Sequence, residues 1–475
     1  MRRMTICLAM AIVLGGAAAV RAQEQNATRQ LAREIFKQLI EINTTDTSRG
    51  NVTTAAEAMA KRLRDAGFPE KDVLVEGPSA RKKNMVARIH GTGKRKPVLF
   101  IGHLDVVEAL KEDWTTDPFQ FIEKDGYYYG RGTSDMKDGD SILMANFIRL
   151  KQEGYQPDRD LILALTADEE GGDWNGVDWL VKHHRDWIDA EYCINLDGGS
   201  FTSDKGKKLS GAIQAAEKMY QDFQLETRNP GGHSSRPSPD NAIYHLAEGL
   251  ARLGKYSFPV ELNEITRAML EKGAALRSGQ VAADMAAAAK TPADPAAIAR
   301  LSENPTYNAL LRTTCVATML EGGHARNALP QRARANVNCR MLPGTDPQKV
   351  LETIERVVAD PQIKVSFAEQ KDADGNLILP VTVPPSPLRP DVTGAVEKVT
   401  HALWPGLPIL PVMSTGASDG KFLRMNGIPT YGVSAVFGEL NDNRAHGQDE
   451  RVLVESFHAA VEFNYRLMKE ISSGK

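Results

Sequence analysis

The chain has 475 residues, too many for one small hydrophobic core, so we expect two domains or one large domain with an insertion. Its hydrophobic content of 42% and charged content of 25% are ordinary for a globular protein and exclude a largely disordered chain. The formal net charge of -3 leaves no surplus of basic residues, so we expect no nucleic-acid partner.

Residues 1–22 have the composition of an export signal. Arg2 and Arg3 form a basic start, residues 8–20 are apolar and rich in alanine, and Val20-Arg21-Ala22 resembles a cleavage site. A membrane anchor is the alternative, but the apolar run is shorter than the roughly 20 residues that span a bilayer. We therefore expect a signal peptide over 1–22 and a periplasmic or secreted mature protein without membrane contact.

Residues 23–211 alternate apolar strand-like runs with helix patterns. Such alternation predicts an α/β architecture, with a mostly parallel sheet flanked by helices. The expected strands are 84–89, 98–101, 161–166 and 193–196, and the expected helices are 139–152 and 177–184. This segment forms the first part of the larger domain in our prediction.

The pattern changes near residue 211 to long alternating strands with helices between them. This change predicts an inserted α+β domain over 212–370, built on an antiparallel sheet and carrying a helical extension at about 261–303. The expected strands are 216–226, 313–320, 334–341 and 363–368, and the expected helices are 242–253 and 347–358. Residues 371–475 return to βα units and complete the larger domain, with helices at 390–401 and 454–470 and strands at 409–413 and 429–434.

The cysteines do not form a disulfide framework. Cys7 leaves with the signal, and the remaining Cys193, Cys315 and Cys339 are odd in number and scattered. We expect free buried thiols. A cross-strand disulfide is the alternative for Cys315 and Cys339, because their strand-like runs can pair as a hairpin.

Short acidic and histidine-bearing segments follow or end the strand-like runs of the larger domain. Open α/β sheets place their chemistry beyond the carboxyl ends of their strands. Imidazoles and carboxylates suit Zn²⁺ when no cysteine is supplied, and five ligands with one shared carboxylate can hold two ions about 3.5 Å apart. The candidate ligands are His103, Asp135, Glu169 or Glu170, Asp197 and His446.

Each candidate has a structural alternative when it is taken singly. An Asp at a strand end is commonly a helix cap or turn residue, and an isolated His is commonly structural. Their joint occurrence at strand ends favours a metal site.

Glu169 and Glu170 are expected to have different roles. Adjacent side chains point in different directions, so one can bind metal while the other acts as a base. Asp105 follows His103 by two residues and is placed to accept the ring N–H that does not face a metal. A helix cap is the alternative for Asp105.

The ordered set of motifs resembles the di-zinc metallopeptidase and amidohydrolase family of glutamate carboxypeptidase, carboxypeptidase S, acetylornithine deacetylase, succinyl-diaminopimelate desuccinylase and aminoacylase. The resemblance covers nearly all of the mature chain. It rests on the segments Gly102 to Val107, Gly130 to Gly139, Asp168 to Gly172, Gly231 to Ser235 and Ala445 to Glu450.

The resemblance implies a role for each ligand. Asp135 bridges two zinc ions, for which Co²⁺ or Mn²⁺ can substitute. His103 and Asp197 complete one site, and Glu170 and His446 complete the other. Glu169 is then the general base and Asp105 the orienting residue. The resemblance also implies a cis peptide bond between Asp135 and Met136, and a homodimer formed through the inserted domain.

The inserted domain is expected to supply further groups. His233, in a glycine-rich turn, is our candidate donor to the oxyanion, and in the resembling enzymes this histidine reaches the site of a partner subunit. Arg340 matches the position that binds a substrate carboxylate, a contact that suits a guanidinium. Asn327 and Gly416 match substrate-contacting positions, with ordinary turn chemistry as the alternative.

These features together predict an exported di-zinc hydrolase that cleaves an amide bond next to a free carboxylate. The substrate is a small peptide or an N-acyl amino acid, so the enzyme is a carboxypeptidase or dipeptidase, or an N-acyl amino acid hydrolase. Glu169 takes the proton of a metal-activated water.

Two alternatives remain at this point. Gly416-Ala417-Ser418-Asp419-Gly420 fits the turn of a serine hydrolase, with Asp442 and His446 downstream, but this leaves the upstream carboxylates unexplained. A non-catalytic periplasmic solute-binding protein fits the signal and the architecture, but it needs neither Glu169 nor paired metal ligands.

Overall fold

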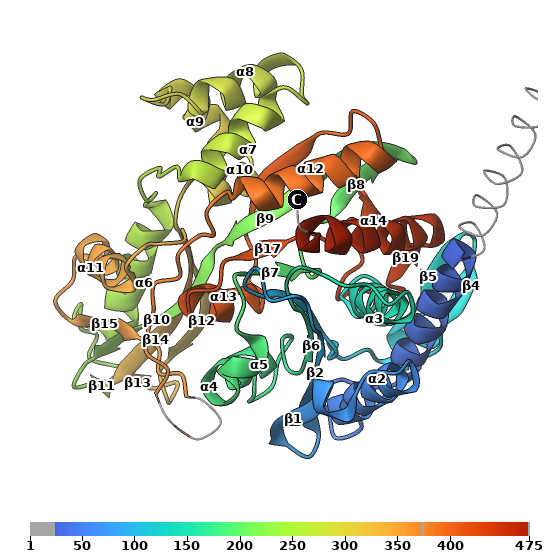
Figure 1. Ribbon diagram of the computed structural model, residues 1–475. Coiled ribbons are helices and arrows are strands. Elements are labelled where there is room, and N and C mark those ends of the chain that lie inside the picture. The colour runs from blue at the N-terminus through green and yellow to red at the C-terminus, as the bar shows by residue number, and fades with distance from the viewer. Residues whose placement is uncertain (1–23, 372–374, 376, 474–475) are drawn as a thin grey trace, which may run out of the picture. The chain divides into compact units, whose positions relative to one another are not determined.

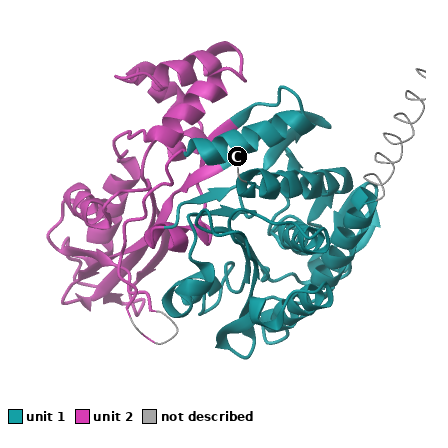
Figure 2. Ribbon diagram, in the orientation of Figure 1, with its two compact units in different colours: residues 1–213, 389–409, 428–475 teal, residues 214–388, 410–427 magenta. Residues whose placement is uncertain are grey.

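The computed structural model describes residues 24–371, 375 and 377–473, so the predicted signal peptide lies outside the described residues. The chain divides into two compact units (Figure 2). Unit 1 holds the described residues up to 213, 389–409 and those from 428 onward, and unit 2 holds 214–388 and 410–427. Unit 2 thus takes in 371–388 and 410–427, which the sequence analysis assigned to the larger domain. The predicted domain boundaries stay a prediction.

Unit 1 is built around a mixed sheet flanked by helices (Figure 1). The predicted α/β architecture is therefore confirmed. Its strand order is β1 (Val73–Ser79), β2 (Lys82–Ile89), β6 (Leu161–Thr166), β3 (Val98–His103), β7 (Tyr192–Asn195), β17 (Thr430–Gly432), β9 (Lys207–Glu217), β8 (Phe201–Asp204) and β18 (Phe437–Glu439), with β16 (Ile409–Ser414) paired to β9. At its centre β3 pairs in parallel with β6 and with β7, and β7 pairs in parallel with β17. Every residue of β3 and β6 is buried, which explains their continuous apolar sequences.

Helices lie on both faces of these central strands. The helix α3 (Lys137–Gln152) connects β3 to β6, and α4 (Gly176–His183) with α5 (Arg185–Ile188) connects β6 to β7. Since β6 and β7 flank β3, the two connections run in opposite directions, and right-handed crossovers place their helices on opposite faces. Loops that follow β3 and β6 therefore diverge at a topological switch point, where open α/β sheets bind ligands.

Further helices surround this core. The helix α14 (Val454–Ser472) packs against α3 and against α12 (Pro390–Leu403), and α2 (Val52–Asp65) packs against β1 and β2. Another helix covers residues 24–41. A small sheet joins β19 (Arg451–Leu453), β5 (Tyr127–Tyr129) and β4 (Ile122–Lys124). None of the helices in the described ranges has both the length and the apolar character needed to span a bilayer.

Unit 2 is built on an antiparallel sheet, as predicted. Its order is β12 (Thr314–Gly322), β14 (Arg332–Met341), β10 (Met219–Arg228) and β15 (Ile363–Phe367). Strict alternation along β14 buries Val337 and Cys339 in a core with α6 (Ala242–Lys255) and α11 (Pro347–Val358), while Arg340 points to the other face. A separate pair joins β11 (Gly232–His233) and β13 (Ala328–Leu329).

The alanine-rich extension is helical, with its own small core around Leu270, Met285 and Leu301. It consists of α7 (Glu264–Ala274), α8 (Gly279–Ala288), α9 (Pro295–Ser302) and α10 (Pro305–Leu311). The short α13 (Gly420–Met425) completes the helices of unit 2.

Cys315 and Cys339 form a disulfide, so the expectation of free thiols at these two positions is wrong. The two residues face each other directly across β12 and β14, with their Cα atoms 4.1 Å apart. The pairing of the two strands, which the sequence left open, decides this outcome. Cys193 is a buried thiol that takes no part in this disulfide.

We expect the disulfide to stabilise unit 2. Closing a loop of 24 residues lowers the entropy of the unfolded chain and contributes about 3 kcal/mol to the free energy of unfolding. Denaturant unfolding with and without a reductant measures this contribution. A Cys315→Ala/Cys339→Ala variant is the control, because reductant should not change its midpoint. An unchanged midpoint for the reduced wild type would contradict the prediction.

Candidate metal centre

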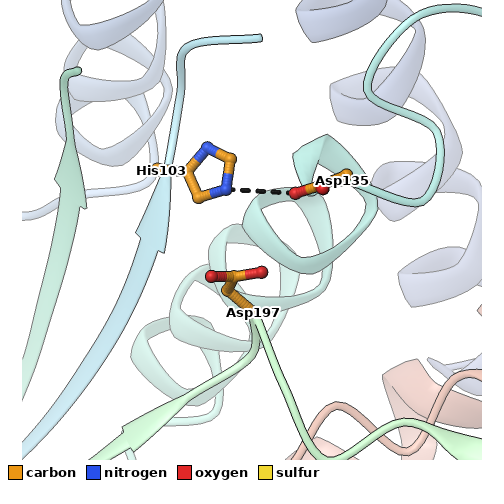
Figure 3. A group of neighbouring side chains, drawn as sticks. All are labelled: His103, Asp135 and Asp197. Carbon is orange, nitrogen blue, oxygen red and sulfur yellow. Dashed lines mark ion pairs between the residues drawn. The ribbon is translucent and has the colours of Figure 1, made fainter. Parts of the chain in front are cut away.

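The carboxylate of Asp135 lies between two imidazoles. Its Oδ1 is 3.2 Å from Nε2 of His103, and its Oδ2 is 3.1 Å from Nε2 of His446. Figure 3 shows His103, Asp135 and Asp197 turned toward one another. The Asp135–Met136 peptide bond is cis, as the resemblance implies. One carboxylate oxygen thus faces each histidine, which is the placement that a carboxylate shared between two ions requires.

Two groups of candidate ligands share Asp135. His103, Asp135 and Asp197 form the first group, and Asp135, Glu170 and His446 form the second. Within each group the ligand atoms lie within 4.8 Å of one another. In the second group, Nε2 of His446 is 2.8 Å from Oε1 of Glu170. All five side chains that the sequence nominated are therefore brought together within unit 1.

The elements of unit 1 explain this convergence. His103 is the last residue of β3, Asp197 follows β7 by two residues, and Glu170 follows β6 by four. Asp135 stands just before α3, and His446 lies in the loop between β18 and β19. Three of the ligands thus come from the carboxyl ends of parallel strands, as expected from the sequence.

The His103 ring faces Asp105 with the nitrogen that points away from Asp135. Its Nδ1 is 3.1 Å from the backbone oxygen of Asp105 and 3.7 Å from that residue's Oδ1. The Asp105 carboxylate instead accepts hydrogen bonds from the backbone N–H of Glu169 at 3.1 Å and of Glu170 at 2.9 Å. The ring is thus nearer to the Asp105 carbonyl than to the carboxylate, and the expected orienting role of that carboxylate stays a prediction. Asp105 still links His103 to the two glutamates.

A buried ion pair holds the turn that carries both glutamates. Asp168 has a left-handed φ of 57°, and its carboxylate accepts from Nζ of Lys82, which also contacts Asp46. Burial raises the pKa of Asp168 to about 6, against the opposing effect of Lys82. A Cβ at Gly172 would lie 2.5 Å from Asp168, so only glycine fits there. No local pattern in the sequence connects Lys82 to this turn, which lies 86 residues away.

The ligand cluster has a strong electrostatic preference for cations. Burial disfavours a charged His103, but Asp135 and nearby carboxylates outweigh it and raise its pKa well above the usual value. Interaction with Asp135 raises the pKa of His446 to about 9. Burial and the adjacent Asp135 raise the pKa of Glu170 to about 7. Two imidazoles and three carboxylates without a cysteine fit Zn²⁺, Co²⁺ or Mn²⁺.

Ion pairs fix the loop around His446, whose backbone has a left-handed φ of 62°. The Asp442 carboxylate accepts from Nε of Arg444 at 2.7 Å and from Nη2 of Arg451 at 2.6 Å. Asp449 accepts from the backbone N–H of Thr115 at 2.9 Å. These contacts tie a long loop to the start of β19 and to the loop that follows β3.

The remaining nominated residues belong to unit 2. His233 and Asn327 are neighbours, because β11 pairs with β13 and the Ser234 N–H donates to the Asn327 carbonyl at 3.0 Å. Nδ1 of His233 accepts from the Ser235 N–H at 3.1 Å. A backbone amide can only donate, so the neutral ring carries its proton on Nε2. Gly416 donates its N–H to Oγ of Ser414 at 3.0 Å, within a turn.

Arg340 has an unusual setting for an arginine. Its guanidinium carbon lies 4.8 Å from the centre of the Tyr220 ring, and its charge helps to lower the pKa of the nearby Asp222 carboxylate. Arg334, six residues earlier on the same face of β14, pairs with Glu321 at 2.7 Å. The Lys218 amine is buried, and both its burial and Arg340 lower its pKa, to about 7.

Ser418 lacks the environment of a nucleophile. It is 5% exposed, and its hydroxyl donates to Oε1 of Glu217 at 2.5 Å. The same Glu217 accepts from Nη2 of Arg424 at 2.6 Å. A carboxylate already neutralised by arginine anchors this serine, which gives it a structural role in unit 2.

Comparison with known proteins identifies the family. The model of peptidase family M20/M25/M40 matches residues 99–470. The chain belongs to this family. The human N-fatty-acyl-amino acid synthase/hydrolase PM20D1 is 26% identical over 465 residues, which cover 95% of this chain and 90% of that protein. The probable carboxypeptidase S-like 2 of Dictyostelium discoideum is 27% identical, over 79% of this chain and 71% of that protein.

Solved structures share the fold. An M20 family metallo-carboxypeptidase from Sulfolobus solfataricus matches with a TM-score of 0.66 and 17% identity, over 92% of this chain and 98% of that chain. Human carnosine dipeptidase 1 matches with a TM-score of 0.63 and 16% identity, over 94% and 97%. The family membership and the groups of candidate ligands show that the protein is a metal-dependent peptidase or amidohydrolase.

We expect metal affinity to increase with pH. In the metal-free protein a proton must leave Glu170 and His446, whose pKa values are about 7 and about 9, before a cation can bind there. These groups hold protons below those values, so affinity is weaker at pH 6 than at pH 8. Competition with a chelating dye measures it. Equal affinity at both pH values, after correction for the dye, would contradict this expectation.

Proposed function

We propose that the protein is an exported di-zinc hydrolase that cleaves an amide bond next to a free carboxylate. The observation that carries the proposal is the Asp135 carboxylate, with one oxygen toward His103 and the other toward His446. His103, Asp135 and Asp197 would hold one ion, and Asp135, Glu170 and His446 would hold the other. When bound, the ions supply Lewis acidity that polarises an amide carbonyl and acidifies a water molecule.

Glu169 is the general base in this proposal. It belongs to neither ligand group, and its main chain is fixed by the hydrogen bond to Asp105. A carboxylate held beside the ligands can accept a proton from water and return it to the nitrogen of the leaving amine. His233 supports the reaction as a donor to the oxyanion, because its neutral ring presents Nε2–H.

Arg340 selects the free carboxylate of the substrate. Its guanidinium lies near the end of β14, over the ring of Tyr220. A guanidinium binds carboxylate with two parallel hydrogen bonds. The names of the relatives, an N-fatty-acyl-amino acid synthase/hydrolase and a dipeptidase, support N-acyl amino acids and small peptides as the substrate class, since both carry such a carboxylate. Asn327 and Gly416 complete the substrate contacts in this proposal.

Two further parts of the proposal concern assembly and location. The edge strand β12 exposes Val316, Met319 and Leu320 by 61%, 64% and 69%, which supports a homodimer formed through unit 2. The composition of residues 1–22 supports export through a cleaved signal.

Glu169→Gln tests the reaction. We expect this variant to bind two ions per chain but to lose nearly all turnover of dipeptides and N-acyl amino acids. The substitution removes the general base and leaves every proposed metal ligand in place. Metal analysis and single-turnover kinetics measure both properties.

A chelator should abolish wild-type activity, and Zn²⁺ or Co²⁺ should restore it. Full activity in excess chelator, with loss on a serine-directed acylating reagent, would return the assignment to Ser418. Metal binding without turnover of any substrate by the wild type would favour a solute-binding role.

Arg340→Met tests carboxylate recognition. We expect kcat/KM to fall about 10- to 100-fold for substrates with a free carboxylate, the loss typical of a charged hydrogen bond. Amidated substrates should be poor for the wild type and unaffected by the substitution. Arg334→Met is the matched control, because Glu321 already neutralises that guanidinium. Equal losses on free and amidated substrates would show that Arg340 does not read the carboxylate.

A further inference from the structure

The carboxylate of Glu450 accepts hydrogen bonds from the segment that leads to Asp135. Glu450 is 0% exposed, and its Oε1 accepts from the Ser134 N–H at 2.7 Å, the Ser134 hydroxyl at 3.1 Å and the Asp135 N–H at 3.1 Å. Its Oε2 accepts from Nη1 of Arg131 at 2.6 Å and from the Gly132 N–H at 3.1 Å. Five donors from one short segment therefore converge on a single buried side chain.

Arg131 extends the network to the other side of the site. It is 3% exposed, and its Nη2 donates to the backbone oxygen of His446 at 3.3 Å. Its guanidinium carbon lies 5.1 Å from the ring centre of Trp114. One guanidinium thus fixes both the Glu450 side chain and the main chain of His446.

The fold brings these groups together by strand pairing. β19 begins directly after Glu450, and β5 ends directly before Gly130. The register sets Arg451 opposite Tyr129, and the Gly130 N–H donates to the Glu450 carbonyl at 3.2 Å. Asp135 and His446 are distant in sequence, but this pairing makes the segments that carry them adjacent.

We infer that Glu450 and Arg131 are positioning residues that set the affinity of the second metal site, formed by Asp135, Glu170 and His446. The inference rests on the proposed two-metal function. Neither residue is a candidate ligand. Partners of metal ligands fix their orientation, and the network holds the backbone of two of the three ligands of that site. The first site shares Asp135, but its His103 is fixed independently by β3 and the Asp105 carbonyl, so only one of its three ligands depends on the network.

Glu450→Gln disrupts the hydrogen bonds of the network while it keeps the volume of the side chain. An amide has one acceptor oxygen, and its NH₂ group would face backbone and guanidinium donors. At least two of the five donors then lose their partner, and the buried Arg131 loses its counter-charge. Arg131→Lys is an independent variant, because an amine keeps the positive charge but cannot reach Glu450 and His446 as a planar fork does.

The test is a Co²⁺ titration of metal-stripped enzyme, followed by calorimetry and by visible absorption. We expect two binding events in the wild type. In Glu450→Gln and Arg131→Lys the first event should change little, and the second should weaken by about 10- to 100-fold. Excess Co²⁺ should restore turnover toward the wild-type rate, which distinguishes positioning from a role in the reaction.

Asp158→Asn is the matched control. Asp158 is a largely buried carboxylate that accepts from Nε and Nη2 of Arg95, both at 2.7 Å, at the opposite ends of the strands from the ligands. Both metal affinities should match the wild type in this variant. Thermal unfolding verifies that each variant folds, and Arg131→Lys decides the test if Glu450→Gln does not fold.

The possible results separate the inference from the proposed function. Wild-type enzyme that binds fewer than two ions defeats the two-metal proposal itself. If the wild-type enzyme binds two ions and the variants bind both with unchanged affinity, the positioning role is overturned. Equal weakening of both events in the variants also overturns it, since a general loss of structure then explains the result.

Discussion

The parallel pairing of β6, β3 and β7 is the constraint on which the metal centre depends. The register sets His103 opposite Thr166, and Ile101 opposite Asn195. Asp197 follows Asn195 by two residues, as His103 follows Ile101, so the two ligands leave the sheet at the same level. The Asp168 turn begins two residues after Thr166. A shift of the register would separate side chains whose ligand atoms must lie within a few ångströms of one another.

The sheet cannot place the other two ligands. Asp135 and His446 come from connections, where nothing in a strand ladder fixes the side chain. The protein meets this difficulty with buried charge, since Asp135 and the His446 main chain both depend on the Glu450 and Arg131 pair. Asp105 likewise supports two candidate ligands. Its backbone carbonyl contacts the His103 ring, and its carboxylate accepts from the backbone N–H of Glu170. A cluster that concentrates negative charge is stable only when its supports are themselves hydrogen-bonded.

Much of the architecture could be predicted because each element carries its own periodicity. The buried run at 161–166 coincides with β6, and the amphipathic pattern at 347–358 coincides with α11. Strands without a strong apolar signal were missed, among them β1 and the short β19–β5–β4 sheet. Those weak strands matter for the site, because the residues of the positioning network lie directly beside β19 and β5. Sequence proximity placed Asp105 beside His103, but it could not show that the same carboxylate also holds the backbone amides of Glu169 and Glu170.

The sequence by itself determined the chemistry of this protein: imidazoles and carboxylates at strand ends, a spare glutamate beside a ligand, and an arginine on an alternating strand. Residue type and period are local properties, and they can be read without the fold. Only the tertiary structure decided which oxygen faces which nitrogen, that Lys82 and Glu450 support the site, and that Cys315 meets Cys339 across two strands. These outcomes depend on pairing between segments far apart in the chain, and such pairing is set by packing and register.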